Sequence, residues 1–200
     1  MALFRDWFCT SLLGLVPGRE DSLLLERSFS VLSQAALGQQ QMCVHRDYHS
    51  RNLLYRGENP PGVLDFQDAV IGPVTYDLVS LLKDCYIAWP RERVNGWALE
   101  YAGLAKQQGI LENFAPETFL RDFDLMGVQR HLKAIGIFAR LDLRDGKPGY
   151  LNDIPRSLEY IRAVVPEHQS LRELGGWIEE TVVPAMEEKL FPLLQTGATL

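Results

Sequence analysis

The sequence predicts an α+β protein that is mainly α, with a few short strands in the first half of the chain. Long segments repeat apolar residues at helical spacing, and the longest runs from residue 116 to about residue 145. Three short runs, at 42–44, 52–55 and 63–65, are rich in apolar and β-branched residues and are typical of strands. The length of 200 residues and the hydrophobic fraction of 46% predict one domain, residues 1–200.

The expected helices are separated by glycine and proline, which open or end helices. In chain order they cover residues 2–13, 21–37, 75–85, 91–108, 116–145, 155–165 and 170–190, with a loop over 146–155. In the second of these helices we expect the core-facing side chains to be Leu23, Leu24, Phe29, Val31 and Leu32. The long helix over 116–145 is apolar on more than one side, so we expect it to be the buried spine of the fold.

Composition argues against several classes of protein. The formal charge of −6 and the pI of about 5.3 predict no broad basic surface, so we expect no nucleic-acid partner. No apolar stretch reaches about 18 residues, and we therefore expect no membrane span. Cys9, Cys43 and Cys85 are an odd number at wide spacing, which indicates small buried side chains in a reducing compartment. These features predict a cytoplasmic protein.

Residues 42–86 carry the motif around which the chain is organised. A His-Arg-Asp triplet at 45–47 is followed, after four residues, by Asn52, which is the spacing of a phosphotransferase catalytic loop. Asp65, followed by phenylalanine, occurs where a metal-holding Asp-Phe pair should come. A single acidic residue would more often cap a helix or turn the chain, but coincidence is a poor explanation of the ordered set.

Phosphoryl transfer explains why these residue types are needed. The protein must orient a hydroxyl nucleophile and neutralise charge that spreads over the phosphate oxygens. Asp47 is therefore the candidate catalytic base. Asn52 and Asp65 provide an amide oxygen and a carboxylate, the hard oxygen ligands that Mg²⁺ prefers, and are the candidate metal- and nucleotide-binding residues.

This stretch resembles the catalytic core of the aminoglycoside phosphotransferase and choline kinase superfamily, kinases of small molecules with a protein-kinase-like fold. The segment over 65–86 resembles one branch more narrowly, the bacterial anomeric kinases of N-acetylmuramate and N-acetylglucosamine that act in cell-wall recycling. The resemblance implies ATP and Mg²⁺ as cofactors, a small-molecule substrate, Asp47 as the base, and Asn52 and Asp65 as magnesium ligands. It also implies that Asp77 braces the catalytic loop, and we expect His45 to support the loop structurally.

Two residues of the motif region differ from those of related kinase groups. Residue 46 is arginine where many antibiotic kinases carry glycine, and residue 67 is glutamine where protein kinases carry glycine. Neither a Gly-rich loop nor a lysine occurs before the motif, since the first lysine is Lys83. We therefore expect a carboxyl-terminal lobe alone, which contacts a missing amino-terminal lobe and is inactive by itself.

Three other functions remain as alternatives. An aminoglycoside phosphotransferase is the first, and a non-catalytic remnant that acts as an interaction module is the second. The third is a metal-dependent hydrolase, whose ligands would be His45, Asp47, His49, Asp65 and Asp68.

The acceptor's binding residues are a separate question. If the acceptor carries a carboxylate, an arginine or histidine near Asp47 should bind it. Arg51, Arg130 and His131 are candidates, although each could equally be an ordinary surface charge on a helix.

Overall fold

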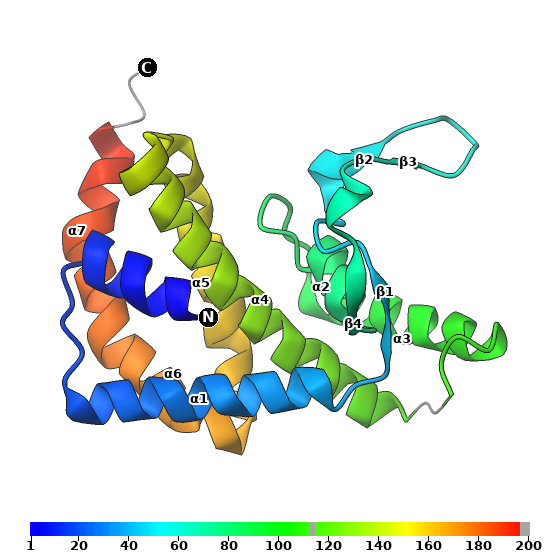
Figure 1. Ribbon diagram of the computed structural model, residues 1–200, viewed down its shortest axis with the longest axis horizontal. Helices are drawn as coiled ribbons and strands as arrows, with labels where there is room; N and C mark the ends of the chain where they lie inside the picture. The colour runs from blue at the N-terminus through cyan, green and yellow to red at the C-terminus, as the bar shows by residue number, and fades with distance from the viewer. Residues whose placement is uncertain (113–114, 197–200) are drawn as a thin grey trace. The chain divides into compact units, whose positions relative to one another are not determined.

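The computed structural model describes residues 1–112 and 115–196, and the chain forms two compact units. Unit 1 consists of Met1–Ser33 and His131–Leu200, and unit 2 is Gln34–Arg130. Helices make up most of the described chain and the few strands are short, which confirms the α+β, mainly α class (Figure 1). The assignment of one domain to residues 1–200 stays a prediction.

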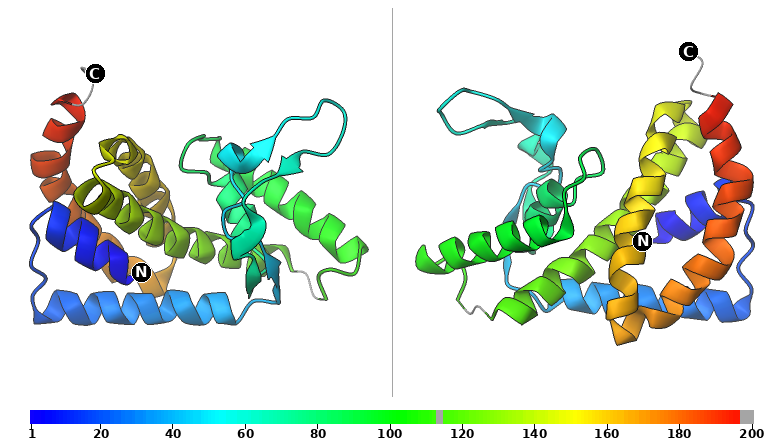
Figure 2. Two further views of the ribbon diagram at one scale, coloured as in Figure 1. Left: turned by 45° about the horizontal axis from the view of Figure 1, so that its top comes forward. Right: turned by 180° about the vertical axis from the view of Figure 1, so that it is seen from behind.

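Unit 1 is built from helices. It contains a π-helix at Phe4–Leu12, most of α1 (Arg19–Leu37), the second half of α4 (Pro116–Asp145), α5 (Ile154–Val164), α6 (Arg172–Trp177), a second π-helical turn at Ile178–Val182, and α7 (Val183–Thr196). The expected loop after α4 contains a 3₁₀ segment at Pro148–Asp153. Figure 2 shows these helices from two further sides. None of the helices within the described ranges combines the length and apolar character that crossing a membrane requires.

The buried face of α1 differs from the predicted one. Leu25, Ser28 and Leu32 are buried, whereas Leu23 is 48% exposed. The prediction is confirmed for Leu32 and wrong for Leu23, and it missed Leu25 and Ser28, because the buried stripe is narrow and includes a serine. The long helix α4, in contrast, begins and ends as predicted and carries buried side chains along most of its length.

In unit 1 the backbones of two helices approach each other at Gly136 of α4. A Cβ atom at this position would lie 2.3 Å from the carbonyl carbon of Leu3 and 2.5 Å from the backbone nitrogen of Phe4. Both atoms belong to the main chain, so a rotamer change could not relieve the clash. Only glycine therefore allows the first helix to pack at this depth.

We expect Gly136→Ala to lower the free energy of unfolding by about 1–3 kcal/mol, because the first helix must move away from α4. The measurement is the denaturant midpoint followed by circular dichroism. Gly176→Ala in α6 is the matched control, since a Cβ there would meet nothing within 4 Å and should stabilise the helix. Equal effects of the two substitutions would contradict the close approach.

Unit 2 combines two small antiparallel sheets with three helices. The strands are β1 (Gln41–Val44), β2 (Leu53–Leu54), β3 (Gly62–Val63) and β4 (Val70–Pro73), and the helices are α2 (Tyr76–Leu82), α3 (Arg91–Gln107) and the first half of α4. β1 pairs with β4 and β2 pairs with β3. The sequence predicted the first three strands and missed β4, because its glycine and proline are typical of a turn.

The pairing of β1 with β4 brings two distant loops together. Val44 at the end of β1 pairs with Val70 at the start of β4. The loop that leaves β1 and the loop that enters β4 therefore lie at the same end of this sheet. The sheet is also tight, since a Cβ at Gly72 would lie 2.7 Å from Val44 Cγ2.

Alternation along β1 decides the burial of one cysteine. Val44 points into the core, whereas Cys43 is exposed because neighbouring residues in a strand face opposite sides. The expectation of three buried cysteines is thus wrong for Cys43 and confirmed for Cys9 and Cys85.

The core of unit 2 joins the strands to the helices. Its buried members come from β1, α2, α3 and α4 and from the segments between them: Val44, Val74, Tyr76, Val79, Val94, Ala98, Ala102, Ala105, Leu111, Phe119, Phe123 and Met126. Small alanines on α3 allow close packing against larger residues, such as the phenylalanines of α4. This core provides a fixed support for α2, which carries Asp77.

Candidate active site

The loop after β1 is held by one carboxylate. Asp77, in the first turn of α2, accepts hydrogen bonds from the backbone N–H of His45 at 2.6 Å and of Arg46 at 3.0 Å. Both of its oxygens are therefore used by the two residues that precede Asp47. A carboxylate that accepts two backbone hydrogen bonds is a strong and directional anchor. The loop consequently leaves β1 in a fixed direction.

The His45 ring connects this loop to the segment that follows β3. Its Nε2 lies 2.8 Å from the carbonyl oxygen of Leu64, and the backbone N–H of Asp47 points to its Nδ1 at 3.3 Å. The second contact requires Nδ1 to accept, so Nε2 carries the proton and donates to Leu64. His45 therefore acts as a spacer between the two loops.

Asp47 offers an uncommitted carboxylate. Its main-chain oxygen accepts hydrogen bonds from Asn52 Nδ2 at 3.0 Å and from the backbone N–H of His49 at 3.1 Å. Of the residues that the structure describes, none donates a hydrogen bond to its side-chain oxygens. The backbone of this residue is fixed while its carboxylate stays available to a hydroxyl group, which is the arrangement that a general base needs.

Asn52 directly precedes β2, and Asp65 comes two residues after the end of β3, the strand that pairs with β2. Leu53 pairs with Val63, and the backbone N–H of Leu64 donates to the carbonyl oxygen of Asn52 at 3.0 Å. The side-chain amide of Asn52 is oriented by its bond to Asp47, which leaves its Oδ1 without a donor within the described residues. Asp65 is exposed, and Gln67 Nε2 donates to one of its oxygens. This pair of hard oxygen donors fits a magnesium ion that keeps several waters.

Backbone strain coincides with this site. Among the non-glycine residues of the described chain, Arg46 at φ 76° and Asp65 at φ 64° alone have a left-handed backbone. This conformation is unfavourable for residues with a Cβ and persists where the surroundings compensate for it. For Arg46 the compensation is its hydrogen bond to Asp77. Arg46 directly precedes Asp47, and Asp65 is itself a candidate metal residue.

A model of the phosphotransferase enzyme family matches residues 15–115, half of the chain, and this match includes the whole site. The chain belongs to this phosphotransferase family. The resemblance to the aminoglycoside phosphotransferase group that the motif indicated is thereby confirmed.

Three curated relatives of this phosphotransferase are each named N-acetylmuramate/N-acetylglucosamine kinase. The relative from Pseudomonas putida is 49% identical over 178 residues, which are 89% of this chain and 52% of the relative. The relative from Pseudomonas aeruginosa is 47% identical over 88% of this chain and 52% of its own length. The relative from Neisseria meningitidis serogroup B is 44% identical over 90% of this chain and 54% of its own length. The chain thus spans about half the length of the curated relatives that it matches.

A second support of the phosphotransferase loop was not apparent from the sequence. Asp84, which is 1% exposed, accepts hydrogen bonds from the backbone N–H of Ser50 at 3.0 Å and of Tyr86 at 2.9 Å. It therefore fixes the far end of the loop as Asp77 fixes its start. The sequence offered no signal for this role, because the bond between Ser50 and Asp84 joins residues 34 positions apart.

The Tyr86 ring contacts one arginine and one histidine side chain of the catalytic loop. The Arg51 guanidinium stacks over the Tyr86 ring at 3.5 Å, and the His49 ring meets the same ring edge-on at 5.5 Å. Partial burial lowers the pKa of His49; the carboxylate of Asp84 opposes this shift and the guanidinium of Arg130 adds to it. His49 is therefore favoured in its neutral form.

The metal-dependent hydrolase has little support in this geometry. Within the described residues no group of three or more His, Cys, Asp or Glu side chains is placed to hold a metal ion. Both ring nitrogens of His45 bond to the backbone, and Nδ1 of His49 is buried. The ligands that this alternative requires therefore do not converge.

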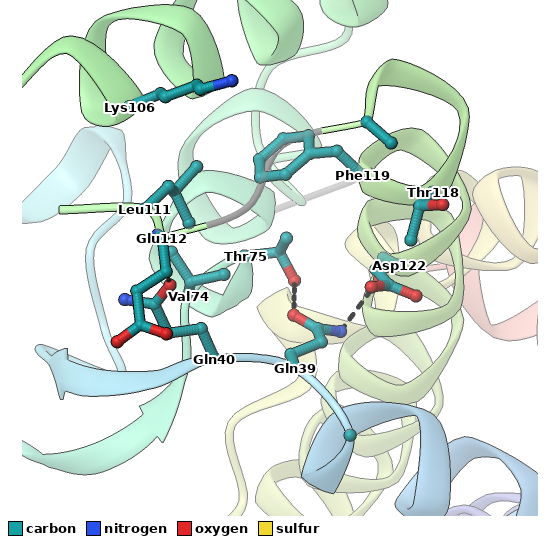
Figure 3. Close-up of a pocket in the computed structure, with 12 residues that line it drawn as sticks. Gln39, Gln40, Val74, Thr75, Lys106, Leu111, Glu112, Thr118, Phe119 and Asp122 are labelled. Atoms are coloured by element: carbon teal, nitrogen blue, oxygen red, sulfur yellow. Dashed lines mark hydrogen bonds between the residues drawn. The ribbon is translucent and has the colours of Figure 1, made fainter. Parts of the chain in front are cut away.

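A cavity of about 660 Å³ lies elsewhere in unit 2 and is lined by none of the candidate catalytic or metal residues. At its floor the side-chain amide of Gln39 accepts from Thr75 Oγ1 at 2.6 Å and donates to the carbonyl oxygen of Asp122 at 3.2 Å (Figure 3). Thr75 directly precedes α2, so this bridge ties the start of α2 to α4 and to the segment before β1. We assign the bridge a structural role, because it fixes the helix that carries Asp77.

Proposed function

We propose that this chain is the catalytic-loop and substrate-binding lobe of an ATP- and Mg²⁺-dependent kinase that phosphorylates a hydroxyl group of an amino sugar. The observation that carries the proposal is the uncommitted carboxylate of Asp47 on a loop whose ends are held by Asp77 and Asp84. Such a group accepts the proton of the attacking hydroxyl while the fixed backbone keeps it in line.

In this proposal Asn52 and Asp65 bind the nucleotide through magnesium. The ion, when bound, neutralises charge on the phosphate oxygens of ATP. The support is a pair of oxygen donors next to the paired strands β2 and β3, one of which is an exposed carboxylate. His45 holds the two loops at a constant separation through its bond to Leu64.

The proposed acceptor is N-acetylmuramate or N-acetylglucosamine. The support is the name N-acetylmuramate/N-acetylglucosamine kinase, which is shared by relatives that are 44–49% identical over about nine-tenths of this chain. An aminoglycoside is the second candidate, because the family match alone does not distinguish the two acceptors. A cytoplasmic location stays part of the proposal.

We further propose that the chain works together with a nucleotide-binding part. The support is an exposed apolar surface on the strands and loops beside the candidate metal residues, where Tyr55 is 92% exposed, Phe66 70% and Ile71 72%. Apolar surface of this kind normally marks an interaction site. A non-catalytic interaction module would use the same surface, so activity is the property that distinguishes the two.

The test is ADP release with N-acetylmuramate, N-acetylglucosamine or an aminoglycoside. The chain is assayed alone and joined to the part of the Pseudomonas putida relative that lies outside its matched segment. We expect background turnover from the chain alone, because it lacks a phosphate-binding lysine and Gly-rich loop, and sugar-dependent turnover from the joined protein. Robust turnover by the chain alone would contradict the two-part proposal. Turnover of the aminoglycoside and of neither amino sugar would show that the acceptor is an aminoglycoside.

The metal residues are tested in the same joined protein. Asp65→Ala should abolish magnesium-dependent ATP binding, measured by calorimetry at saturating Mg²⁺, because it removes the anionic donor of the proposed pair. Glu58→Gln, in the exposed turn between β2 and β3, is the control and should leave ATP affinity within about threefold. Unchanged ATP affinity in the Asp65 variant would remove this residue from the site.

A further inference from the structure

Arg130 on α4 is a buried cation for which the described residues provide no anionic partner. It is 8% exposed, and its one hydrogen bond within the described residues runs from Nη1 to Cys85 Sγ at 3.8 Å. A guanidinium has five N–H donors, and a thiol sulfur is a weak acceptor. Burying a charge without a counter-ion is costly, so such a group points to an anion that binds later.

A second buried cation of unit 2, Lys83 at the end of α2, has a carboxylate partner. Lys83 is 4% exposed, and its Nζ lies 2.6 Å from a carboxylate oxygen of Asp124. Asp124 lies on α4, as Arg130 does. Its other carboxylate oxygen lies 3.6 Å from Nη2 of Arg91. The described part of unit 2 therefore provides a carboxylate for Lys83 and none for Arg130.

The surroundings of Arg130 place it beside the catalytic loop. Cys85, its hydrogen-bond partner, follows Asp84 and precedes Tyr86, and these two residues contact Ser50 and His49 respectively. Arg130 is also close enough to His49 for its positive charge to lower the pKa of the His49 ring. His49 lies two residues after Asp47. Asp84, the carboxylate that directly precedes Cys85 in the chain, already accepts hydrogen bonds from two backbone N–H groups.

We propose that the Arg130 guanidinium binds the carboxylate of an N-acetylmuramate acceptor and thereby determines which sugar is preferred. This inference rests on the proposed function. N-acetylmuramate and N-acetylglucosamine differ by the lactyl ether that carries this carboxylate, so a cation that binds this group distinguishes them. A planar guanidinium can pair with both oxygens of a carboxylate, which fixes the orientation of the sugar as well as its affinity.

The anion could also be the transferred phosphate, and the two sources make different predictions. A cation that binds the phosphate contributes equally to both sugars. A cation that binds the lactyl carboxylate contributes to N-acetylmuramate alone. The ratio of kcat/KM for the two sugars therefore separates them.

The experiment compares wild-type and Arg130→Met forms of the joined protein described above. We expect kcat/KM for N-acetylmuramate to fall about 10- to 100-fold, because a charge-assisted hydrogen bond is lost, and kcat/KM for N-acetylglucosamine to stay within about threefold. Arg130→Lys should recover part of the loss, since an ammonium keeps the charge but not the paired geometry. Arg121→Met, an exposed arginine of α4, is the matched control and should change neither value.

Equal losses for both sugars, or no loss for either, would overturn the proposal. Turnover of neither sugar by the wild-type protein would instead remove the proposed function on which it rests. If the Arg130→Met protein does not fold, the proposal is tested by changing the ligand instead. The methyl ester of N-acetylmuramate should bind the wild-type protein at least about 10-fold more weakly than the acid. Equal affinity for ester and acid would also overturn the proposal.

Discussion

Asp47→Asn in the joined protein should lower kcat by about two to four orders of magnitude and leave the affinities for sugar and ATP within about threefold. The side chain keeps its size and the loop keeps its hydrogen bonds to Asp77, because these involve the backbone of His45 and Arg46. The attacking hydroxyl loses its proton acceptor, while positioning and charge stabilisation remain. Steady-state ADP release, together with calorimetry for each substrate, measures the two effects separately.

The matched control is Glu58→Gln, which makes the same carboxylate-to-amide change in an exposed turn of unit 2. It should retain full turnover. An Asp47→Asn protein with more than about a tenth of wild-type kcat would show that the loop carboxylate is not the base, since even modest general-base catalysis contributes about 100-fold.

The second large effect concerns stability. Asp124→Leu should lower the free energy of unfolding by about 3–5 kcal/mol, because it leaves Lys83 buried without its carboxylate. The cation would then face the ring of Phe123, whose centroid lies 4.3 Å from Nζ, and this contact replaces only a small part of the loss. Urea denaturation followed by circular dichroism measures the change.

The double variant Lys83→Met/Asp124→Leu provides the control. Replacing a buried ion pair by apolar side chains of similar volume is often close to neutral. The double variant should therefore be more stable than the Asp124→Leu variant, although it lacks one more native side chain. The Lys83→Met single variant is measured as well. If the double variant loses as much unfolding free energy as the two single variants together, the pair acts through packing and not through charge.

Local signals explain what could be predicted from the sequence. α4 runs from Pro116 to Asp145 as expected, because proline favours the first helical turn and Gly146 adopts a φ of 63° after the last. The catalytic loop was recognised because its motif is a spacing within eight residues, 45–52. The strands at 41–44, 53–54 and 62–63 were found from their composition.

What could not be predicted depends on contacts between distant segments. Arg130 and His131 could have been surface charges by their position on a helix, yet they are 8% and 0% exposed. Helical spacing shows which residues share a face but not which element covers that face. The pairing of Lys83 with Asp124 joins residues 41 positions apart, and a single sequence contains no signal for it.

The hydrogen bonds that hold the catalytic loop also determine when the loop can form during folding. The bonds of Asp77 to the loop span 31 and 32 residues, the bond of Asp84 to Ser50 spans 34, and the bridge from Gln39 to Thr75 spans 36. Closing chain segments of this length costs entropy before any of these bonds is gained. The loop therefore acquires its shape only after the chain from β2 to β4 has folded back onto β1. Amide hydrogen exchange should accordingly show His45, Arg46 and Ser50 opening together as one cooperative unit, and not as independent turns.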